Sequence, residues 1–562
     1  MNSVRNNDWG LQDVVDFNGN QVSNLTQAVG VTYTLCLKAC GSAPEPFNWQ
    51  IFSSQITSWV LPWLALTSQI PYGPKDKLSQ FLTLVLTVGS PTLAAYSLAL
   101  AVISNRWMVE RFKRSNPRRH ASAVAHVLSD LQQVSLRYPE SNGCISVLPS
   151  LGVLEQNKRW WMDFSQELRA HTQTKWTFAA IMSIFYVLLA SLLTWINTLG
   201  SIPTPPQINA SGVSIGALWL SLLPIVACYL QLSPKIDSDQ IQRAFVKVNR
   251  KIYLAAATGS PSEMNGSHVI SVERTEANDK TCSSPVFYYA RFFSWISMAR
   301  LMTDGFEAAS SHVGDKMPES FSEVNQCCEN YDRHGYSYDV FSIVFRSALL
   351  ALFLQGGATG AAVMATYLTF TTGYTLRRTF YLFYGCLSGI VWLLSLISSL
   401  LARDDSAFEI SGDAENTSIS NHDNHDENSD DTRRSNISNR YHPATRRHRS
   451  IRYVLSCALS HLAKVIAFIN MVFLFAYSLL QFGSVFDSCF WNSVVLSRGA
   501  KYVLLDCIDK YPGAKFFWAG GVAISSATAL SFSVALYLLT KRPVDLSEYI
   551  ELDPIHDSHL DS

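Results

Sequence analysis

The stretch FLTLVLTVGSPTLAAYSLALAVI, residues 81–103, contains no acidic and no basic side chain. It is followed without interruption by SNRWMVERFKRSNPRR, residues 104–119, in which Arg and Lys recur. About 20 apolar residues in a helix cross the hydrocarbon core of a bilayer. Lys and Arg close behind a span keep that end in the cytoplasm. Together the two stretches predict one membrane crossing and its direction, from which the remaining topology can be counted.

Other apolar stretches predict seven further spans. They comprise residues 51–70, 177–196, 213–230, 340–370, 380–402, 458–482 and 516–540. Pro62 and several polar side chains interrupt the first of these, so a re-entrant or interfacial helix is its alternative. The predicted fold is all-α, a polytopic transmembrane bundle of about eight spans with helical cytosolic loops, one disordered loop and both termini in the cytoplasm.

The spans pair into four hairpins separated by polar segments. The predicted divisions are an N-terminal polar segment 1–50, hairpins 51–104, 175–232, 340–402 and 457–541, cytosolic loops 105–174 and 233–339, a disordered loop 403–456 and an acidic tail 542–562. The first cytosolic loop has apolar residues at helical spacing and a KRWW segment. These features predict amphipathic helices that lie on the membrane surface or pack on each other. Arg377 and Arg378 conflict with this topology, because they fall on the non-cytoplasmic side.

The composition favours a membrane protein and disfavours a nucleic-acid role. The chain has 562 residues, of which 48% are hydrophobic and 16% charged, and its formal net charge is zero. Soluble proteins carry about 25% charged residues, so this deficit fits several bilayer segments. A neutral balance implies no domain-wide basic surface for nucleic acid. The lipid bilayer is therefore one predicted partner, and loops 105–174 and 233–339 are the predicted sites for cytosolic protein partners.

No motif predicts catalysis, a metal or a cofactor. The sequence contains no Walker A loop, HExxH, GxSxG or dinucleotide fingerprint, and no CxxC pair. Asp and Glu are also absent from the interiors of the predicted spans. Because coupled transporters use buried carboxylates or broken helices to bind ions, this absence weakens a transporter interpretation. Pro91 in the stretch GSPT could break a helix, either as a packing kink or as an ion-binding break.

Cysteine positions predict one disulfide and leave another open. Cys489 and Cys507 lie in one connection on the predicted non-cytoplasmic side, where oxidation can occur, and we expect them to be bonded. Cys36 and Cys40 are either cytosolic thiols or a lumenal disulfide beside the sequon at Asn24.

Two positions are predicted sites of modification. Asn209 begins a sequon in a Pro-rich connection that lacks Lys and Arg, which predicts glycosylation on the non-cytoplasmic side. Ser450 follows RRHR in the predicted disordered loop, a pattern that basophilic kinases favour. Phosphate there would place negative charge among basic residues near a membrane entry point, as in an electrostatic switch. An inert linker is the alternative.

Glycines four residues apart predict how the fifth and sixth spans meet. Gly356 and Gly360 share one helix face, and Gly385 and Gly389 repeat the spacing in the next span. Small residues permit the close backbone approach that replaces hydrophobic drive in lipid. We therefore expect the two spans to pack through these faces, with Gly360 nearer to Gly385 than Gly356 is.

The stretches FNWQIFSSQITSWVLPWLALTSQIPYG (47–73) and LTVGSPTLAAYSLAL (86–100) resemble a family of multi-pass integral membrane proteins of filamentous fungi. The resemblance extends over the spans, from residue 36 to 402. It implies a fungal integral membrane protein and supplies no activity, substrate or catalytic residue. The predicted location is a membrane, with the plasma membrane and an endomembrane as open alternatives.

Three function classes follow. The favoured hypothesis is a membrane scaffold or regulator that acts through its cytosolic loops. The alternatives are a channel or transporter with a polar path and, least favoured, a membrane enzyme. The first two are distinguished by whether Gln55, Thr87 and Ser90 line a continuous cavity or are packed between helices.

Overall fold

The computed structural model describes residues 13–16, 18–23, 27–44, 46–70, 77–115, 119–133, 136–137, 151–154, 157–171, 178–200, 206–232, 271–272, 279, 282, 284–313, 336–367, 376–419, 451–495, 499–500, 502–504 and 513–540. The helices are α2 (Tyr33–Cys40), α3 (Trp49–Trp59), α4 (Leu61–Thr67), α5 (Lys77–Gly89), α6 (Pro91–Ser115), α7 (Arg119–Asp130), α9 (Lys158–His171), α10 (Phe178–Gly200), α11 (Pro206–Leu220), α12 (Leu222–Leu232), α14 (Tyr288–Val313), α16 (Tyr336–Ala365), α17 (Leu376–Ile419), α18 (Ile451–Phe482), α19 (Cys489–Ser493) and α21 (Gly513–Leu539), with 3-10 turns η2 (Leu131–Gln133) and η6 (Pro285–Phe287). The strands are β1 (Val14–Val15), β2 (Gly30–Thr32), β3 (Leu136–Arg137), β4 (Ser271–Val272), β5 (Val494–Val495), β6 (Gly499–Ala500) and β7 (Tyr502–Leu504).

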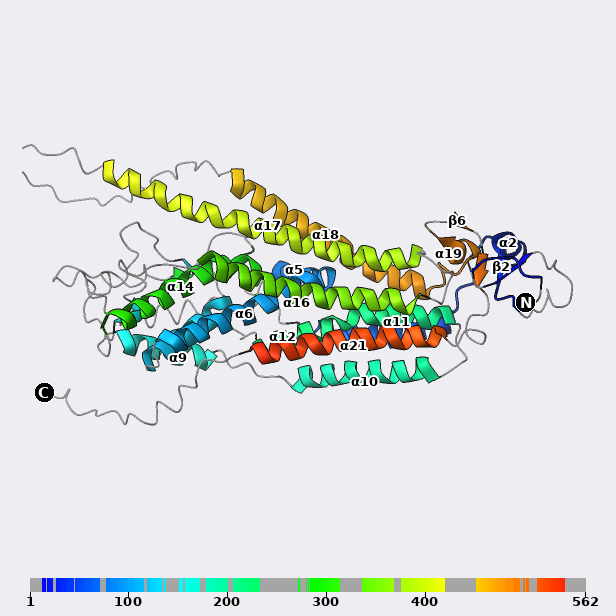
Figure 1. Cartoon of the computed structure of the whole chain (residues 1–562), viewed down its shortest axis with the longest axis horizontal. Coiled ribbons are helices and arrows are strands. Elements are labelled where there is room, and N and C mark those ends of the chain that lie inside the picture. Colours follow the sequence, from blue (N-terminus) through cyan, green and yellow to red (C-terminus); the bar gives the residue numbers. More distant parts are fainter. Residues whose placement is uncertain are drawn as a thin grey trace, which may run out of the picture.

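The molecule is elongated, and its long helices run along the long axis (Figure 1). A small cap lies at one end, and we use this name for β1, β2, β7, α2 and α19. The helix bundle forms the middle. A helical module lies at the other end, and we use this name for α7, α9, α14 and the C-terminal half of α6.

Six helices of the described chain are long and apolar enough to cross a membrane. They cover Phe178–Ile196, Ala210–Gln231, Tyr338–Ala365, Arg377–Ala402, Ile451–Phe482 and Phe516–Leu539. The all-α prediction is confirmed at this level, and several long apolar helices agree with a multi-pass membrane protein. Eight straight spans are not found among the described residues.

The two N-terminal predicted spans account for the difference. Stretch 51–70 is divided at Val60 into α3 and α4, and neither reaches the length needed to cross. Stretch 81–103 is not one straight helix, because α5 and α6 meet at a bend of 103°. Proline lacks an amide donor, and its ring excludes the carbonyl one turn back, so a helix ends before it and a new helix begins. Counted as one span, this bent pair brings the total to seven.

The first and last described elements lie at opposite ends of the bundle. Strand β1 belongs to the cap, whereas α21 starts at the cap end and finishes beside α6, where Arg106 Nη1 donates to the carbonyl oxygen of Leu538 at 3.3 Å. An even number of crossings would bring both ends of the described chain to one face. The predicted count of about eight crossings, with both termini on one side, is therefore not confirmed by the described residues.

Helix α6 lies at the centre of the bundle, where α5, α12, α14, α16, α17 and α21 all pack on it. Every residue from 91 to 100 is buried. The buried face continues toward the module through Met108, Val109 and Phe112. One helix therefore belongs to the cores of both the bundle and the module.

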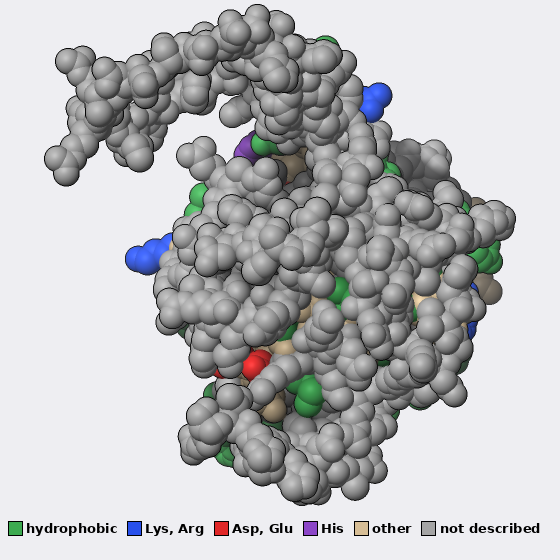
Figure 2. Space-filling model, turned by 90° about the vertical axis from the view of Figure 1, so that its left-hand side faces the viewer, with side chains coloured by type: hydrophobic (Ala, Val, Ile, Leu, Met, Phe, Trp, Pro, Cys, Tyr) green, Lys and Arg blue, Asp and Glu red, His purple; other side chains and the backbone are tan. Residues whose placement is uncertain are grey.

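The amphipathic helices of loop 105–174 pack inside the module rather than on a membrane surface. Trp161 is fully buried, and its Nε1 donates to the carbonyl oxygen of Leu151 at 2.8 Å. Trp295 of α14 is also buried and donates from Nε1 to the carbonyl oxygen of Leu128 at 2.8 Å. Viewed onto this end, the visible described side chains include hydrophobic ones, with Lys and Arg side chains at the margin (Figure 2).

The loop predicted as disordered is partly helical. Helix α17 continues beyond the apolar span to Ile419, and α18 begins at Ile451. A helix that has already formed can extend into polar sequence, because each added residue gains a backbone hydrogen bond without the cost of nucleating a new helix. Residues 420–450, with the predicted phosphorylation site Ser450, lie outside the described residues.

Candidate functional site

The bend between α5 and α6 is the most unusual feature of the bundle. Ser90 alone separates the two helices, and all residues from 85 to 100 are buried. Gly89 allows α5 to approach α18 closely, since a Cβ at this position would overlap the carbonyl oxygen of Ala467. Broken helices of this kind form ion and substrate sites in many transporters, where free backbone groups face the ligand. The partners of the freed groups therefore decide what this break can do.

Side chains of α17 and α18 occupy the carbonyls that the break exposes. Tyr384 donates its hydroxyl to the carbonyl oxygen of Val88 at 2.8 Å. Asn470 is completely buried, and its Nδ2 donates to the carbonyl oxygen of Gly89 at 2.7 Å and to that of Tyr384 at 3.2 Å. Since neutral donors already occupy both carbonyls, the break is built as a joint between helices.

Ser388 of α17 completes this joint from the α6 side. Its hydroxyl oxygen accepts from the amide of Thr92 at 3.2 Å and shares a hydrogen bond with the Thr92 hydroxyl at 2.8 Å. The hydroxyl of Ser90 donates to the carbonyl oxygen of Ser388 at 2.9 Å. The first turn of α6 is thereby fixed to α17 by side chains that carry no charge.

The three polar residues that could have lined a path are packed between helices. The Thr87 hydroxyl donates to the carbonyl oxygen of Thr83 in its own helix at 2.7 Å, and the Ser90 hydroxyl is used in the joint. Gln55 is 7% exposed. Thr87, Ser90 and Gln55 are therefore packed between helices and do not line a continuous cavity.

A short segment, η6 with the first residues of α14, inserts between the helices on the module side of the joint, and we call it the plug (residues 284–289). Val286, Phe287 and Tyr288 are completely buried, and η6 packs on α5 and α6. Ser97 of α6 donates its hydroxyl to the carbonyl oxygen of Val286 at 2.8 Å. Ser399 of α17 donates to that of Tyr289 at 3.1 Å.

The plug is also held by charged groups. Arg291 is buried and donates to the carbonyl oxygens of Cys282 and Ser284. It lies outside the membrane-spanning helices, and burial lowers its pKa to about 10. Bonding main-chain carbonyls in this way fixes the entry of the chain into α14.

Asp279 joins the plug region to α18. Its carboxylate is paired with the Lys464 ammonium and accepts hydroxyl hydrogen bonds from Ser460 at 2.5 Å and Tyr289 at 2.9 Å. The side chains of Asp279 and Lys464 are 9% and 15% exposed. The ammonium of Lys464 therefore points to a buried carboxylate rather than to solvent.

At the cap end, the two arginines that conflicted with the predicted topology are internal. Arg377 is 1% exposed and reaches the Phe486 carbonyl oxygen, Asp487 at 2.8 Å and Asn492 at 3.0 Å. Arg378 donates to the carbonyl oxygens at the end of α16 and lies over the ring of Tyr367, 5.1 Å from its centroid. Because both side chains are buried cross-links rather than exposed charges near the end of a span, they no longer conflict with the positive-inside tendency.

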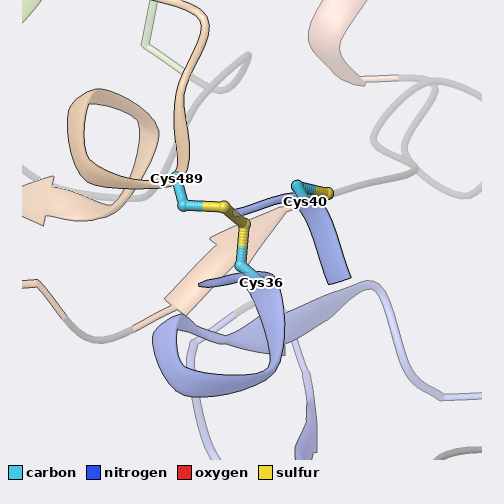
Figure 3. A group of neighbouring side chains, drawn as sticks. All are labelled: Cys36, Cys40 and Cys489. Atoms are coloured by element: carbon cyan, nitrogen blue, oxygen red, sulfur yellow. A yellow bond between two sulfur atoms is a disulfide. The ribbon is translucent and has the colours of Figure 1, made fainter. Parts of the chain in front are cut away.

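The cap contains a disulfide that differs from the predicted one. The structure bonds Cys489 to Cys36, which is 453 residues away in sequence (Figure 3). Strand β2 pairs with β7 immediately before α2 and brings the two segments together, an arrangement that local spacing cannot predict. Cys507, the predicted partner, lies outside the described residues. Cys40 is an exposed free thiol beside the bond.

Asn209, the predicted glycosylation site, lies in the first turn of α11 rather than in an open connection. Nothing in the structure tests its modification.

Three of the four glycines predicted to join α16 and α17 are rotated away from the contact. Gly356, Gly360 and Gly389 have open space where a Cβ would stand. Gly385 does face α16. A Cβ added to Gly385 would lie 2.7 Å from the hydroxyl oxygen of Thr359, which is too close unless that side chain moves. Gly357 instead packs on Thr528 of α21, because neighbouring residues in a helix point about 100° apart.

Sequence reasoning missed several residues that hold the site. Asn470 carried a signal, because an amide side chain inside an apolar span usually has a buried partner. Tyr384 and Ser388 are common in membrane helices and carried none. Asp279 lies in a polar stretch where nothing marks burial.

Comparison of the chain with profiles of known families, with curated proteins and with solved structures gives no match.

Proposed function

We propose that this protein is a membrane-embedded scaffold or regulator that meets its partners through the helical module. The observation that carries this proposal is the course of α6, which is buried in the bundle from residue 91 and continues into the module core. A module that shares its central helix with the bundle cannot move independently of it. Binding at the module would therefore bias the bundle, which is what a regulator requires.

The junction between α6 and α14 supports a rigid connection. Arg111 donates to both carboxylate oxygens of Glu307, at 2.8 and 2.9 Å, and pairs with Asp304 at 3.0 Å. Phe112 and Phe306 pack edge-to-face with ring centroids 5.5 Å apart. Bidentate Arg–carboxylate pairs add geometric specificity to their energy.

The proposed orientation places the module in the cytoplasm and the cap outside. Lys113, Arg114, Arg346 and Arg452 are exposed toward the module end, as the positive-inside tendency expects. The cap disulfide fits an oxidising compartment. This orientation replaces two cytoplasmic termini with an N-terminal segment outside and a C-terminal segment inside, over seven crossings.

Cysteine accessibility distinguishes a scaffold from a channel or transporter. We would introduce Thr87→Cys, Ser90→Cys and, as the matched exposed control, Lys113→Cys, and treat the protein in nanodiscs with a membrane-impermeant maleimide. Only position 113 should gain label above the wild type, because the other two hydroxyls are packed. Labelling at 87 or 90 would show a water path and would favour the channel or transporter.

The positive claim is tested by site-specific photo-crosslinking in native membranes. A photoreactive residue at position 113 should give discrete protein adducts. The same residue at Phe185, an exposed position on α10, should give none of them. Adducts of equal yield and identity at both positions would contradict a partner site on the module.

A further inference from the structure

Three cysteine sulfurs gather in the cap, and only two of them are bonded. The Sγ atoms of Cys36, Cys40 and Cys489 all lie within 4.8 Å of one another (Figure 3). Cys36 and Cys489 are buried, whereas Cys40 is exposed. Because two of the sulfurs already form a disulfide, the group offers one thiolate, and the chemistry open to it is thiol–disulfide exchange.

We propose that Cys40 is an exchange thiol, which converts the Cys36–Cys489 disulfide into a Cys40–Cys489 disulfide and back. Cys40 loses its proton to water, and the thiolate attacks the sulfur of Cys489. The new Cys40–Cys489 bond forms as the Cys36–Cys489 bond breaks, and Cys36 leaves as a thiolate that takes up a proton. One disulfide and one thiol stand on each side of the reaction, so no oxidant or reductant is needed.

The helix geometry selects Cys489 as the sulfur under attack. Cys36 and Cys40 are four residues apart on one face of α2. Residues at this spacing have Cβ atoms about 5–6 Å apart, whereas a disulfide needs about 3.5–4.5 Å. Attack on Cys36 would therefore require α2 to unwind. Attack on Cys489 instead moves the bond by one helical turn, about 5.4 Å along α2.

We expect the Cys36–Cys489 and Cys40–Cys489 forms to have similar free energies. Both disulfides close nearly the same length of chain, so their loop-closure terms cancel. What differs is local, because exchange would bury the freed Cys36 thiol among Val14, Leu35 and Val503, a setting suited to an uncharged thiol.

The position of the bond is coupled to the membrane bundle. Asp487, two residues before Cys489, pairs with Arg377 at 2.8 Å, and Arg377 lies at the start of α17. A one-turn shift of α2 against α19 would therefore act on the outer end of a spanning helix. Thiols and disulfides in the surrounding compartment could reach this site through exposed Cys40.

The test is disulfide mapping of the full-length protein in detergent. Free thiols are alkylated after incubation at stepwise pH, and peptides are separated without reduction. We expect a Cys40–Cys489 peptide beside Cys36–Cys489, and we expect it to appear faster at higher pH, since the thiolate is the nucleophile. Cys40→Ser should abolish it, and Cys386→Ser, which removes an exposed cysteine on α17, should not.

A second variant tests the reach of the sulfurs. In Cys36→Ser, a Cys40–Cys489 disulfide should form and both thiols should resist maleimide. Free labelling of both would overturn the proposal. A wild-type Cys40 that is alkylated completely at every pH, or found bonded to Cys507, would also overturn it.

Discussion

The ion pair between Asp279 and Lys464 allows a quantitative test of how the plug is held. We consider Lys464→Met, which removes the ammonium but keeps most of the side-chain volume, and Asp279→Asn, which removes the charge and keeps an acceptor. Removing one partner of a buried pair costs about 3–5 kcal/mol, because the other charge is left uncompensated. In Lys464→Met the carboxylate keeps its hydroxyl donors from Ser460 and Tyr289, so we expect the lower end of that range.

The double variant separates the pair from its surroundings. With both charges absent no buried charge remains, and replacing a buried pair by neutral groups is often close to neutral. With each single cost near about 3 kcal/mol and a double cost near zero, we therefore expect a coupling free energy of about 6 kcal/mol in the double-mutant cycle, above the roughly 0.5–3 kcal/mol typical of contacting residues.

Thermal unfolding in detergent, followed by tryptophan fluorescence, measures the effect. Because 1 kcal/mol shifts the Tm of a 150–250-residue domain by about 2–4 °C, each single variant should melt several degrees below the wild type. Arg346→Met, at an exposed cation of α16, is the matched control and should change the Tm little. The reasoning is refuted if Lys464→Met melts with the wild type, or if the double variant loses the sum of the single effects.

Three further predictions concern the joint and the module. Asn470→Leu leaves the Gly89 carbonyl without its donor, which should cost about 1–3 kcal/mol; Ser478→Ala, which removes a hydroxyl bonded only within α18, should cost less, and equal Tm values would contradict this. Gly89→Ala should lower the Tm strongly because its Cβ has no room, whereas Gly356→Ala should leave the Tm unchanged or raise it; the reverse order would exclude the close contact of α5 and α18. Burial raises the pKa of Asp304 despite the neighbouring arginines, so its charged form is penalised in the folded state. The free energy of unfolding, measured relative to Asp304→Asn, should therefore fall as pH rises from 3.8 through the raised pKa, and should level off above it. A rise in stability over that range would contradict this prediction.

Hydropathy predicted the elements whose structure depends on local sequence. Helices α10, α18 and α21 are long apolar runs, and each appears as one helix close to its predicted range. The same method placed a straight span over residues 81–103, because an apolar count does not record whether the chain keeps its direction through Pro91. A helix that passes through a proline and one that turns by 103° have the same hydropathy.

The remaining failures concern contacts between residues distant in sequence. Arg377 looked like a topological charge, since its partner Asp487 is 110 residues away. The Cys489 disulfide depends on the pairing of β2 with β7, which no spacing rule contains. Gly356, Gly360 and Gly389 do not make the predicted contact, because sequence gives the periodicity of a helix without its rotation toward its neighbours. Pairing and rotation are set by the whole bundle.

The chemistry along α6 changes from one end to the other, and this change bears on regulation. Its first turn is fixed by neutral hydrogen bonds from Ser388 and by the close approach that Gly89 allows, in a region buried from water. Such bonds average about 0.6 kcal/mol in a membrane protein and are not screened by salt. Its last turns are held by Arg111, Asp304 and Glu307, whose side chains are 17%, 11% and 19% exposed. Partly buried charge pairs are screened by salt less than exposed pairs, but protonation of a carboxylate or competition from a charged partner would break them. Under the proposed function, a partner of the module would act on the charged end of α6, while the joint keeps the other end in place. The plug lies between these two ends, so a displacement of α14 that follows the loss of the Arg111 contacts would reach it before it reached the joint.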